Sequence, residues 1–82
     1  MAIPVYVPSL KSRDDPIRVG TWLVDIGQHV DSGDRIVELE LTGMVYVVST
    51  ESSGTIETIE QRRGDRVQQG EILAWLEEDQ AA

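Results

Sequence analysis

Short hydrophobic segments with a period of two run along the whole chain, separated by glycines and acidic residues. They are "IPVYV", "IRVGTWLV", "RIVELEL", "MVYVV", "TIETI", "RVQ" and "EILAWLE". Apolar residues that alternate with polar ones are typical of strands with one buried face, and β-branched residues dominate these segments. No segment shows a sustained 3.6-residue period, so the pattern predicts an all-β chain with no helix longer than one turn.

The chain also contains an internal repeat. "GQHVDSGDRIVELE" (27–40) aligns with "GDRVQQGEILAWLE" (64–77) at a constant offset of 37 residues. Each half reads as strand, glycine turn, short strand, glycine turn and strand. Because a unit of about 40 residues cannot bury its apolar face alone, we predict two sheets packed across a quasi-twofold axis. The aligned pairs are Gly27/Gly64, Val30/Val67, Gly33/Gly70, Asp34/Glu71, Ile36/Leu73, Leu39/Leu76 and Glu40/Glu77, with Val19/Ile56 and Trp22/Ile59 upstream.

The stretch "VELELTGMVYVV" (37–48) predicts a hairpin with a two-residue turn at Thr42-Gly43. Such turns need residues that tolerate a positive φ, and glycine tolerates it best. We expect Gly27 and Gly64 to have the same conformational role, with φ above zero.

The two-residue turn sets the register of the hairpin: Leu41 faces Met44, Leu39 faces Tyr46 and Val37 faces Val48. Strand residues alternate between faces, so Tyr46 and Val48 are expected on the core side with Leu39. Val45 and Val47 then point outward beside Glu40 and Glu38. This apolar stripe rimmed by acids is the candidate partner surface, and it comprises Glu38, Glu40, Thr42, Met44, Val45 and Val47.

Length and charge exclude several functions. An 82-residue chain can bury one thin core but no deep cleft, which argues against a self-contained enzyme. The net charge of −8 opposes binding to nucleic acids, and the chain has no cysteine. "MAIPVYVPSL" is not a signal peptide, and no apolar run approaches the roughly 20 residues that span a membrane. We therefore expect a cytoplasmic protein, or an organelle protein whose targeting segment has been removed. The acidic end suggests a domain over residues 1–78 and a disordered tail or linker over 79–82.

Candidate catalytic and metal-binding residues are few. His29 is the sole histidine and is expected to be a surface residue in a turn. The aspartates do not have the order of a calcium loop, and no base lies near a serine in sequence, so we predict no catalytic residues and no metal site. Trp22 and Trp75 are expected to pack at the core or its rim. The aspartates and serines excluded in this way are Asp14, Asp15, Asp31, Asp34, Ser9, Ser49 and Ser52.

The spacing of these motifs resembles the lipoyl and biotinyl domains. The shared pattern is G-x-x-V-x-x-G-[DE], a hydrophobic-Glu hairpin, then S-G and a second G-D-x-V-x-x-G. "VPSL", "WLVDIGQHVDSGD" and "IVELE" are most similar to the lipoyl domains of 2-oxo acid dehydrogenase acyltransferases. The resemblance covers about residues 2 to 78. It implies the barrel-sandwich hybrid fold, with two four-stranded antiparallel sheets.

In that family the hairpin carries a lysine whose amine takes lipoate or biotin through an amide bond. The resemblance places Thr42 and Gly43 where the family has an acidic residue and this lysine. We therefore predict that no cofactor is attached. The chain's single lysine is Lys11, in the loop that lies beside the hairpin in the family, and it lacks the presentation that modifying enzymes read.

Three functions follow from the resemblance. The first is an unmodifiable, non-catalytic lipoyl-type domain that acts as a monomeric interaction or structural module, with a protein partner such as a 2-oxo acid dehydrogenase component. The alternative is a lysine-substituted variant or fragment of an acyltransferase lipoyl domain, whose native role is to carry acyl groups. The third, an adaptor domain of an efflux or secretion assembly, is disfavoured because such domains usually have a helical insertion at the hairpin.

Overall fold

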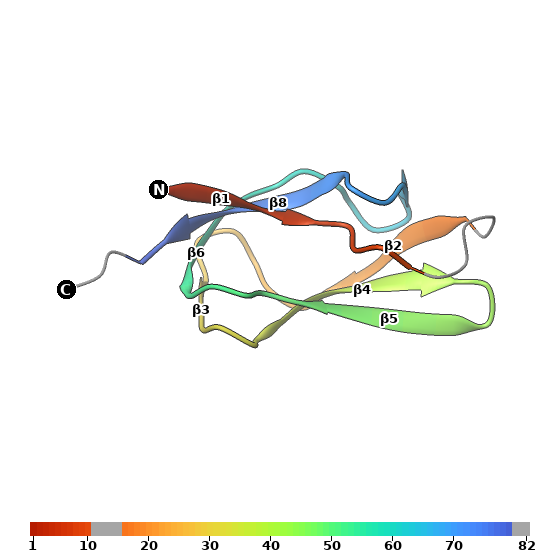
Figure 1. Cartoon of the computed structure of the whole chain (residues 1–82), viewed down its shortest axis with the longest axis horizontal. Helices are drawn as coiled ribbons and strands as arrows, with labels where there is room; N and C mark the ends of the chain where they lie inside the picture. The colour runs from red at the N-terminus through yellow and green to blue at the C-terminus, as the bar shows by residue number, and fades with distance from the viewer. Residues whose placement is uncertain (11–15, 80–82) are drawn as a thin grey trace.

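The alternating segments of the sequence form eight β-strands in the computed structural model, which describes residues 1–10 and 16–79 (Figure 1). The described residues contain no helix, and therefore none that is long and apolar enough to cross a membrane. The strands are β1 (Ala2–Tyr6), β2 (Ile17–Trp22), β3 (His29–Val30), β4 (Arg35–Leu41), β5 (Met44–Ser49), β6 (Gly54–Ile59), β7 (Arg66–Val67) and β8 (Ile72–Glu78).

The strands form two four-stranded sheets, with the orders β1-β8-β6-β3 and β5-β4-β2-β7. Every pairing is antiparallel. Each sheet combines strands from both halves of the chain, so neither half can form its sheets alone. The predicted fold class, an all-β barrel-sandwich with two four-stranded antiparallel sheets, is confirmed.

Backbone hydrogen bonds recur at the offset of the sequence repeat. The amide of Gly27 donates to Ile56 at 2.7 Å, and the amide of Gly64 donates to Val19 at 2.7 Å. In the first bond the donor is in the first half of the chain and the acceptor in the second, and in the second bond these roles are reversed. A twofold rotation that relates the two halves requires this reversal. The amide of Leu23 donates to Ile36, and 37 residues later the amide of Glu60 donates to Leu73, both at 2.8 Å. The predicted quasi-twofold symmetry is therefore present in the backbone.

The repeated apolar residues form the core between the sheets. Ile36, Leu39, Leu73 and Leu76 have no exposed surface. Val30 and Val67, in the short strands β3 and β7, are also buried. Trp22 and Trp75 are half-buried, and the indole Nε1 of Trp22 donates to the Gln61 carbonyl oxygen at 2.9 Å. Trp22 packs against the core, as predicted, whereas Trp75 is not among the partly buried residues that contact it.

Two expectations need correction near the carboxyl end. His29 lies in strand β3 rather than in a turn, because its backbone pairs with Thr55 of β6. Asp79, expected in the tail, has a backbone amide that donates to the Ser53 carbonyl oxygen at 3.0 Å. Its carboxylate also contacts His29, so Asp79 belongs to the folded part of the chain.

Candidate functional site

The β4–β5 hairpin has the register that the sequence predicts. Leu41 pairs with Met44, Leu39 with Tyr46 and Val37 with Val48. The intervening pairs, Glu40 with Val45 and Glu38 with Val47, lie between them.

Gly43 occupies the second position of the turn, with φ of +77°. A side chain is disfavoured there by the backbone conformation and not by crowding, because no atom lies within 4 Å of the place that a Cβ would take. The turn lies at the end of the molecule remote from both termini (Figure 1). The hairpin therefore presents its turn to solvent as the tip of an elongated domain measuring 43 × 20 × 17 Å.

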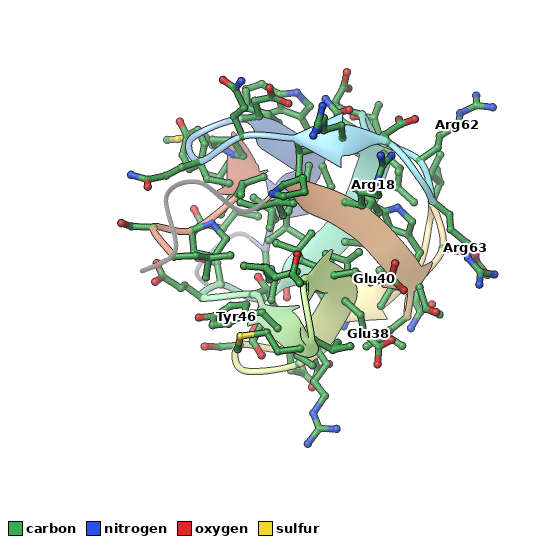
Figure 2. All side chains as sticks on the ribbon, turned by 90° about the vertical axis from the view of Figure 1, so that its right-hand side faces the viewer. Arg18, Glu38, Glu40, Tyr46, Arg62 and Arg63 are labelled. Atoms are coloured by element: carbon green, nitrogen blue, oxygen red, sulfur yellow. The ribbon has the colours of Figure 1, made fainter. Side chains whose placement is uncertain are left out.

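The outer face of the hairpin combines apolar and acidic side chains. Val45 is 55% exposed and lies across from Glu40, and the half-buried Val47 lies across from Glu38. Both glutamates lie on the same side of the tip in Figure 2. The expected stripe therefore exists, and the register places one acid beside each valine.

Two residues of the hairpin differ from the expected arrangement, and the first is Met44. Met44 is 57% exposed but pairs with the buried Leu41, so it lies on the face opposite to Val45 and Val47. The candidate surface thus extends around the tip instead of covering a single face.

Tyr46 corrects a second expectation. It is on the inner side with Leu39, as predicted, but it is 39% exposed instead of buried in the core. Val48, on the same face of β5, is buried, whereas Tyr46 is nearer the tip and borders an open groove between the edge strands β1 and β5. Figure 2 shows Tyr46 on the other side of the tip from Glu38 and Glu40.

Glu38 and Glu40 form no ion pair within residues 1–10 and 16–79. Arg18 is the cross-strand neighbour of Glu40, yet its guanidinium Nη1 donates to the Gly64 carbonyl oxygen at 3.3 Å. Gly20, which sequence reasoning did not single out, makes room for Glu40. A Cβ at this position would lie 3.1 Å from the Glu40 Cγ and 3.0 Å from the Glu38 carbonyl oxygen. A glycine inside a strand is the signal that could have identified this close approach.

An open groove on the inner side of β5 was also missed. It has a volume of about 350 Å³ and runs between the edge strands β1 and β5. Tyr6, Tyr46 and Val48 line it, together with Pro4 and Pro8. Sequence patterns identify the strands but not which two edges come together, so the groove is visible only in the folded chain.

The sole histidine lies far from the hairpin in the fold, next to the carboxyl end. His29 Nε2 is 2.8 Å from an Asp79 carboxylate oxygen, and Nδ1 is 4.0 Å from one of Asp31. The hydrogen bond and negative charge of Asp79 raise the pKa of His29 above its ordinary value of 6.5, with smaller contributions from Asp31 and Asp34. The pair links β3 to the end of β8.

Among the remaining candidates, Asp31 and Asp34 have a structural role in a turn. The Asp34 carboxylate accepts a bond from the Asp31 amide at 2.8 Å, which closes the turn at Gly33. Lys11, Asp14 and Asp15 lie outside the described residues. Within the described ones, no group of three histidine, cysteine or acidic side chains could hold a metal ion.

This fold, with a hairpin tip at the end remote from the termini, defines a class of small β-domains. Residues 5–76 match the family model described as "Biotin-requiring enzyme", the biotin/lipoyl family. The chain therefore belongs to the biotin/lipoyl domain family.

Curated relatives place it near one group of multienzyme complexes. It is 30% identical over 74 residues to the dihydrolipoyllysine-residue succinyltransferase component of the 2-oxoglutarate dehydrogenase complex of Bacillus subtilis, covering 90% of this chain and 18% of that protein. The same component of Staphylococcus saprophyticus is 33% identical over 70 residues, covering 85% of this chain and 16% of the relative. The chain thus spans less than a fifth of the length of these two relatives.

Solved structures agree on the fold. The lipoyl domain of the 2-oxoglutarate dehydrogenase complex from Azotobacter vinelandii superposes with a TM-score of 0.71 at 30% identity, covering 90% of this chain and 96% of that domain. Urea carboxylase from Kluyveromyces lactis matches with a TM-score of 0.75 at 26% identity, covering 93% of this chain and 6% of that protein. The chain is therefore a lipoyl-type domain related to the acyltransferases of 2-oxoglutarate dehydrogenase complexes.

Proposed function

We propose that this chain is a lipoyl-type domain that carries neither lipoate nor biotin at its hairpin tip and acts as a non-catalytic interaction module. Its partner is a protein, such as a component of a 2-oxo acid dehydrogenase complex. The proposal places the domain in the cytoplasm as a monomer. The observation that carries the proposal is Gly43 at the tip of the β4–β5 hairpin.

Covalent attachment of either cofactor needs a primary amine at the tip. In the proposed alignment, Gly43 stands in the position of the lysine of cofactor-bearing relatives. Glycine has no side chain, and the neighbouring Thr42 and Met44 have no amine. The tip residues therefore do not fit an amide-linked cofactor, and we derive no acyl-transfer step for this domain.

The partner surface in this proposal comprises Glu38, Glu40, Thr42, Met44, Val45 and Val47. Support comes from two properties of the hairpin. Large apolar side chains are exposed on both faces of the hairpin tip, with Val45 on the outer face and Met44 and Tyr46 on the inner face. Glu38 and Glu40 flank the valines and form no ion pair within the described residues. Apolar surface rimmed by charge is typical of interaction sites.

The test is to express the chain together with lipoate ligase, biotin ligase and both cofactors, and to measure the intact mass. We expect the unmodified mass, since Gly43 offers no amine. The Lys11→Arg variant is the matched control, because it removes the only side-chain amine of the chain. A mass increase in the parent chain that disappears in this variant would assign the cofactor to Lys11 and contradict the proposal.

A second candidate function is supported by how little of the acyltransferases the chain spans, since it covers 18% and 16% of the two relatives above. In this case the chain is a lysine-substituted variant or fragment of an acyltransferase lipoyl domain. The Gly43→Lys variant, offered to lipoate ligase, separates the two functions. Efficient modification would show that a ligase still recognises the hairpin and favours the second function. Refusal would show divergence beyond the tip, as the first function expects.

A further inference from the structure

The two sheets have four edges, and three of them are protected against further strand pairing. The edge strands β3 and β7 have two residues each, too few to support an added strand. The third edge is β1, where the Met1 carbonyl oxygen accepts a bond from the Glu78 amide of β8 at 3.0 Å. Since backbone groups alternate in direction, the nitrogen of Pro4 lies at the free side, where it has no hydrogen to donate.

The fourth edge, β5, is unprotected. Its six residues, "MVYVVS", include neither a charge nor a proline. Leu41 and Met44 close a two-residue hairpin, so the backbone groups of Met44, Tyr46 and Val48 point toward β4. The same alternation continues at Thr50, whose backbone groups also point toward the segment before β4. Its amide donates to the Asp34 carbonyl oxygen, and its carbonyl oxygen accepts from the Gly33 amide. The N–H and C=O groups of Val45 and Val47 therefore point away from the sheet.

We propose that β5 binds an extended segment of a protein partner as an additional antiparallel strand, with basic and apolar residues alternating along the segment. This proposal rests on the proposed function as an interaction module and specifies how that module binds. Backbone bonds to Val45 and Val47 provide the affinity, and alternate side chains provide the selectivity.

The two faces of the hairpin set the chemistry of this segment. In an antiparallel pair, residues that face each other place their side chains on the same side of the sheet. Partner residues opposite Val45 and Val47 therefore lie on the outer face, about 10 Å or two strand spacings from Glu38 and Glu40. A lysine or arginine is favoured there, because its long side chain can extend across the valines toward the two carboxylates. Intervening residues point to the inner side, where the groove lined by Tyr6, Tyr46 and Val48 accepts apolar side chains.

Charge argues against a second copy of this chain as the occupant. Self-pairing along β5 would bring together two molecules that each have a net charge of −8. It would also place Glu38 and Glu40 of both copies on the rims of one interface. A basic partner segment instead gains from the same charges.

The probe is a short synthetic peptide, blocked at both ends, in which valine and lysine alternate. Amide hydrogen exchange of the full chain is followed by NMR with and without the peptide. We expect exchange at Val45 and Val47 to slow by about tenfold at saturation. Exchange at Tyr46 should change little, because its amide already pairs with β4. Binding without slower exchange at Val45 and Val47 would overturn the proposal.

Two N-methylated peptides isolate the backbone contribution while keeping every side chain. Methylation of the backbone nitrogens of the lysine residues removes the amide donors that face β5 and should abolish binding. Methylation at the valine nitrogens, which face solvent, should preserve it. Equal binding of the two methylated peptides would show that charge alone holds the peptide, and would refute strand addition.

Charge selectivity is tested with paired variants. Glu38→Gln with Glu40→Gln should weaken peptide binding several-fold, whereas Glu57→Gln with Glu60→Gln, on and after β6, should have a much smaller effect. Sedimentation of the chain alone tests the competing occupant. A dimer that is lost in Val47→Pro would assign the edge to a second copy and overturn the proposal. These outcomes are independent of the mass measurement, which alone tests the absence of a cofactor.

Discussion

Turn glycines at equivalent positions of the two halves have the same backbone conformation. Gly27 and Gly64 both have φ of +89°, and no atom lies within 4 Å of the place that a Cβ would take at either one. Their requirement for glycine is therefore conformational. Gly54 requires glycine for a different reason, which is steric. Its φ is not positive, but a Cβ there would overlap the carbonyl oxygen of Glu77 in the neighbouring strand.

Gly64→Ala should lower the free energy of unfolding by about 1 kcal/mol, because alanine is strained at positive φ. Gly54→Ala should cost more, since the backbone of β8 must move to accommodate a methyl group. Urea unfolding measures both changes through the midpoint and the slope. A neutral Gly64→Ala variant would contradict the conformational role.

The contact of His29 with Asp79 makes stability depend on pH. Asp79 raises the pKa of His29 above 6.5 in the folded chain, so folding favours the protonated imidazole. This stabilisation is complete below the unfolded-state pKa and is lost as the pH rises through the raised folded-state pKa. Since both side chains are about half exposed, solvent screening keeps the effect small.

We expect NMR titration of the single histidine to give a pKa above 6.5 in the parent chain. Asp79→Asn should lower this pKa, because it removes the charge and the strongest acceptor. The variant should also show a smaller loss of stability between about pH 6 and pH 8. An unchanged pKa in Asp79→Asn would show that the contact does not form in solution.

At the scale of the element, the β4–β5 hairpin separates a buried face from an exposed one through its register. Leu39 has no exposed surface, whereas Val45 is 55% exposed only one cross-strand pair away. A shift by one residue would exchange these environments along the entire hairpin.

Leu39→Ala should therefore cost about 2–5 kcal/mol of unfolding free energy, from lost burial and the cavity left behind. Val45→Ala should change stability by no more than about 0.5 kcal/mol, because its side chain is largely solvated. Both values come from urea unfolding of otherwise identical chains. Similar losses in the two variants would mean that the register is different.

At the scale of the whole molecule, the strands of the two halves are interleaved. Trp22 lies in the sheet β5-β4-β2-β7 and Trp75 in the sheet β1-β8-β6-β3, so each tryptophan reports on one sheet. The core between the sheets is shared, and neither sheet can lose its packing without exposing the other.

We therefore expect two-state unfolding of the whole domain. In single-tryptophan variants made by Trp22→Phe and by Trp75→Phe, the fluorescence transition should coincide with the circular dichroism transition of the same variant. The Trp22→Phe variant should be less stable than the parent chain, because it loses the hydrogen bond from the indole to the Gln61 carbonyl oxygen. Separate fluorescence and dichroism midpoints in either variant would show that one sheet unfolds before the other.

Much of this architecture is determined locally and can be read from the sequence. Alternating apolar residues specify strands, and glycines at a constant offset specify equivalent turns. The dipeptide Thr42-Gly43 sets the hairpin register, because a two-residue turn allows one pairing, and that register is the one observed. The same logic placed the valine and glutamate side chains of the hairpin on one face.

Other features depend on which strands become neighbours in the fold. The alternation of apolar and polar residues within a strand does not specify those neighbours. Tyr46 has a core-side position in the pattern but is exposed, because it borders the open groove between the edges of the two sheets. Asp79 is held in place by β3, a contact across 50 residues of sequence. The groove exists only because the edge strands β1 and β5 of different sheets lie along one side of the domain. Period and turn chemistry determined the strands and the hairpin register, whereas long-range packing decided which edge remains available for a partner.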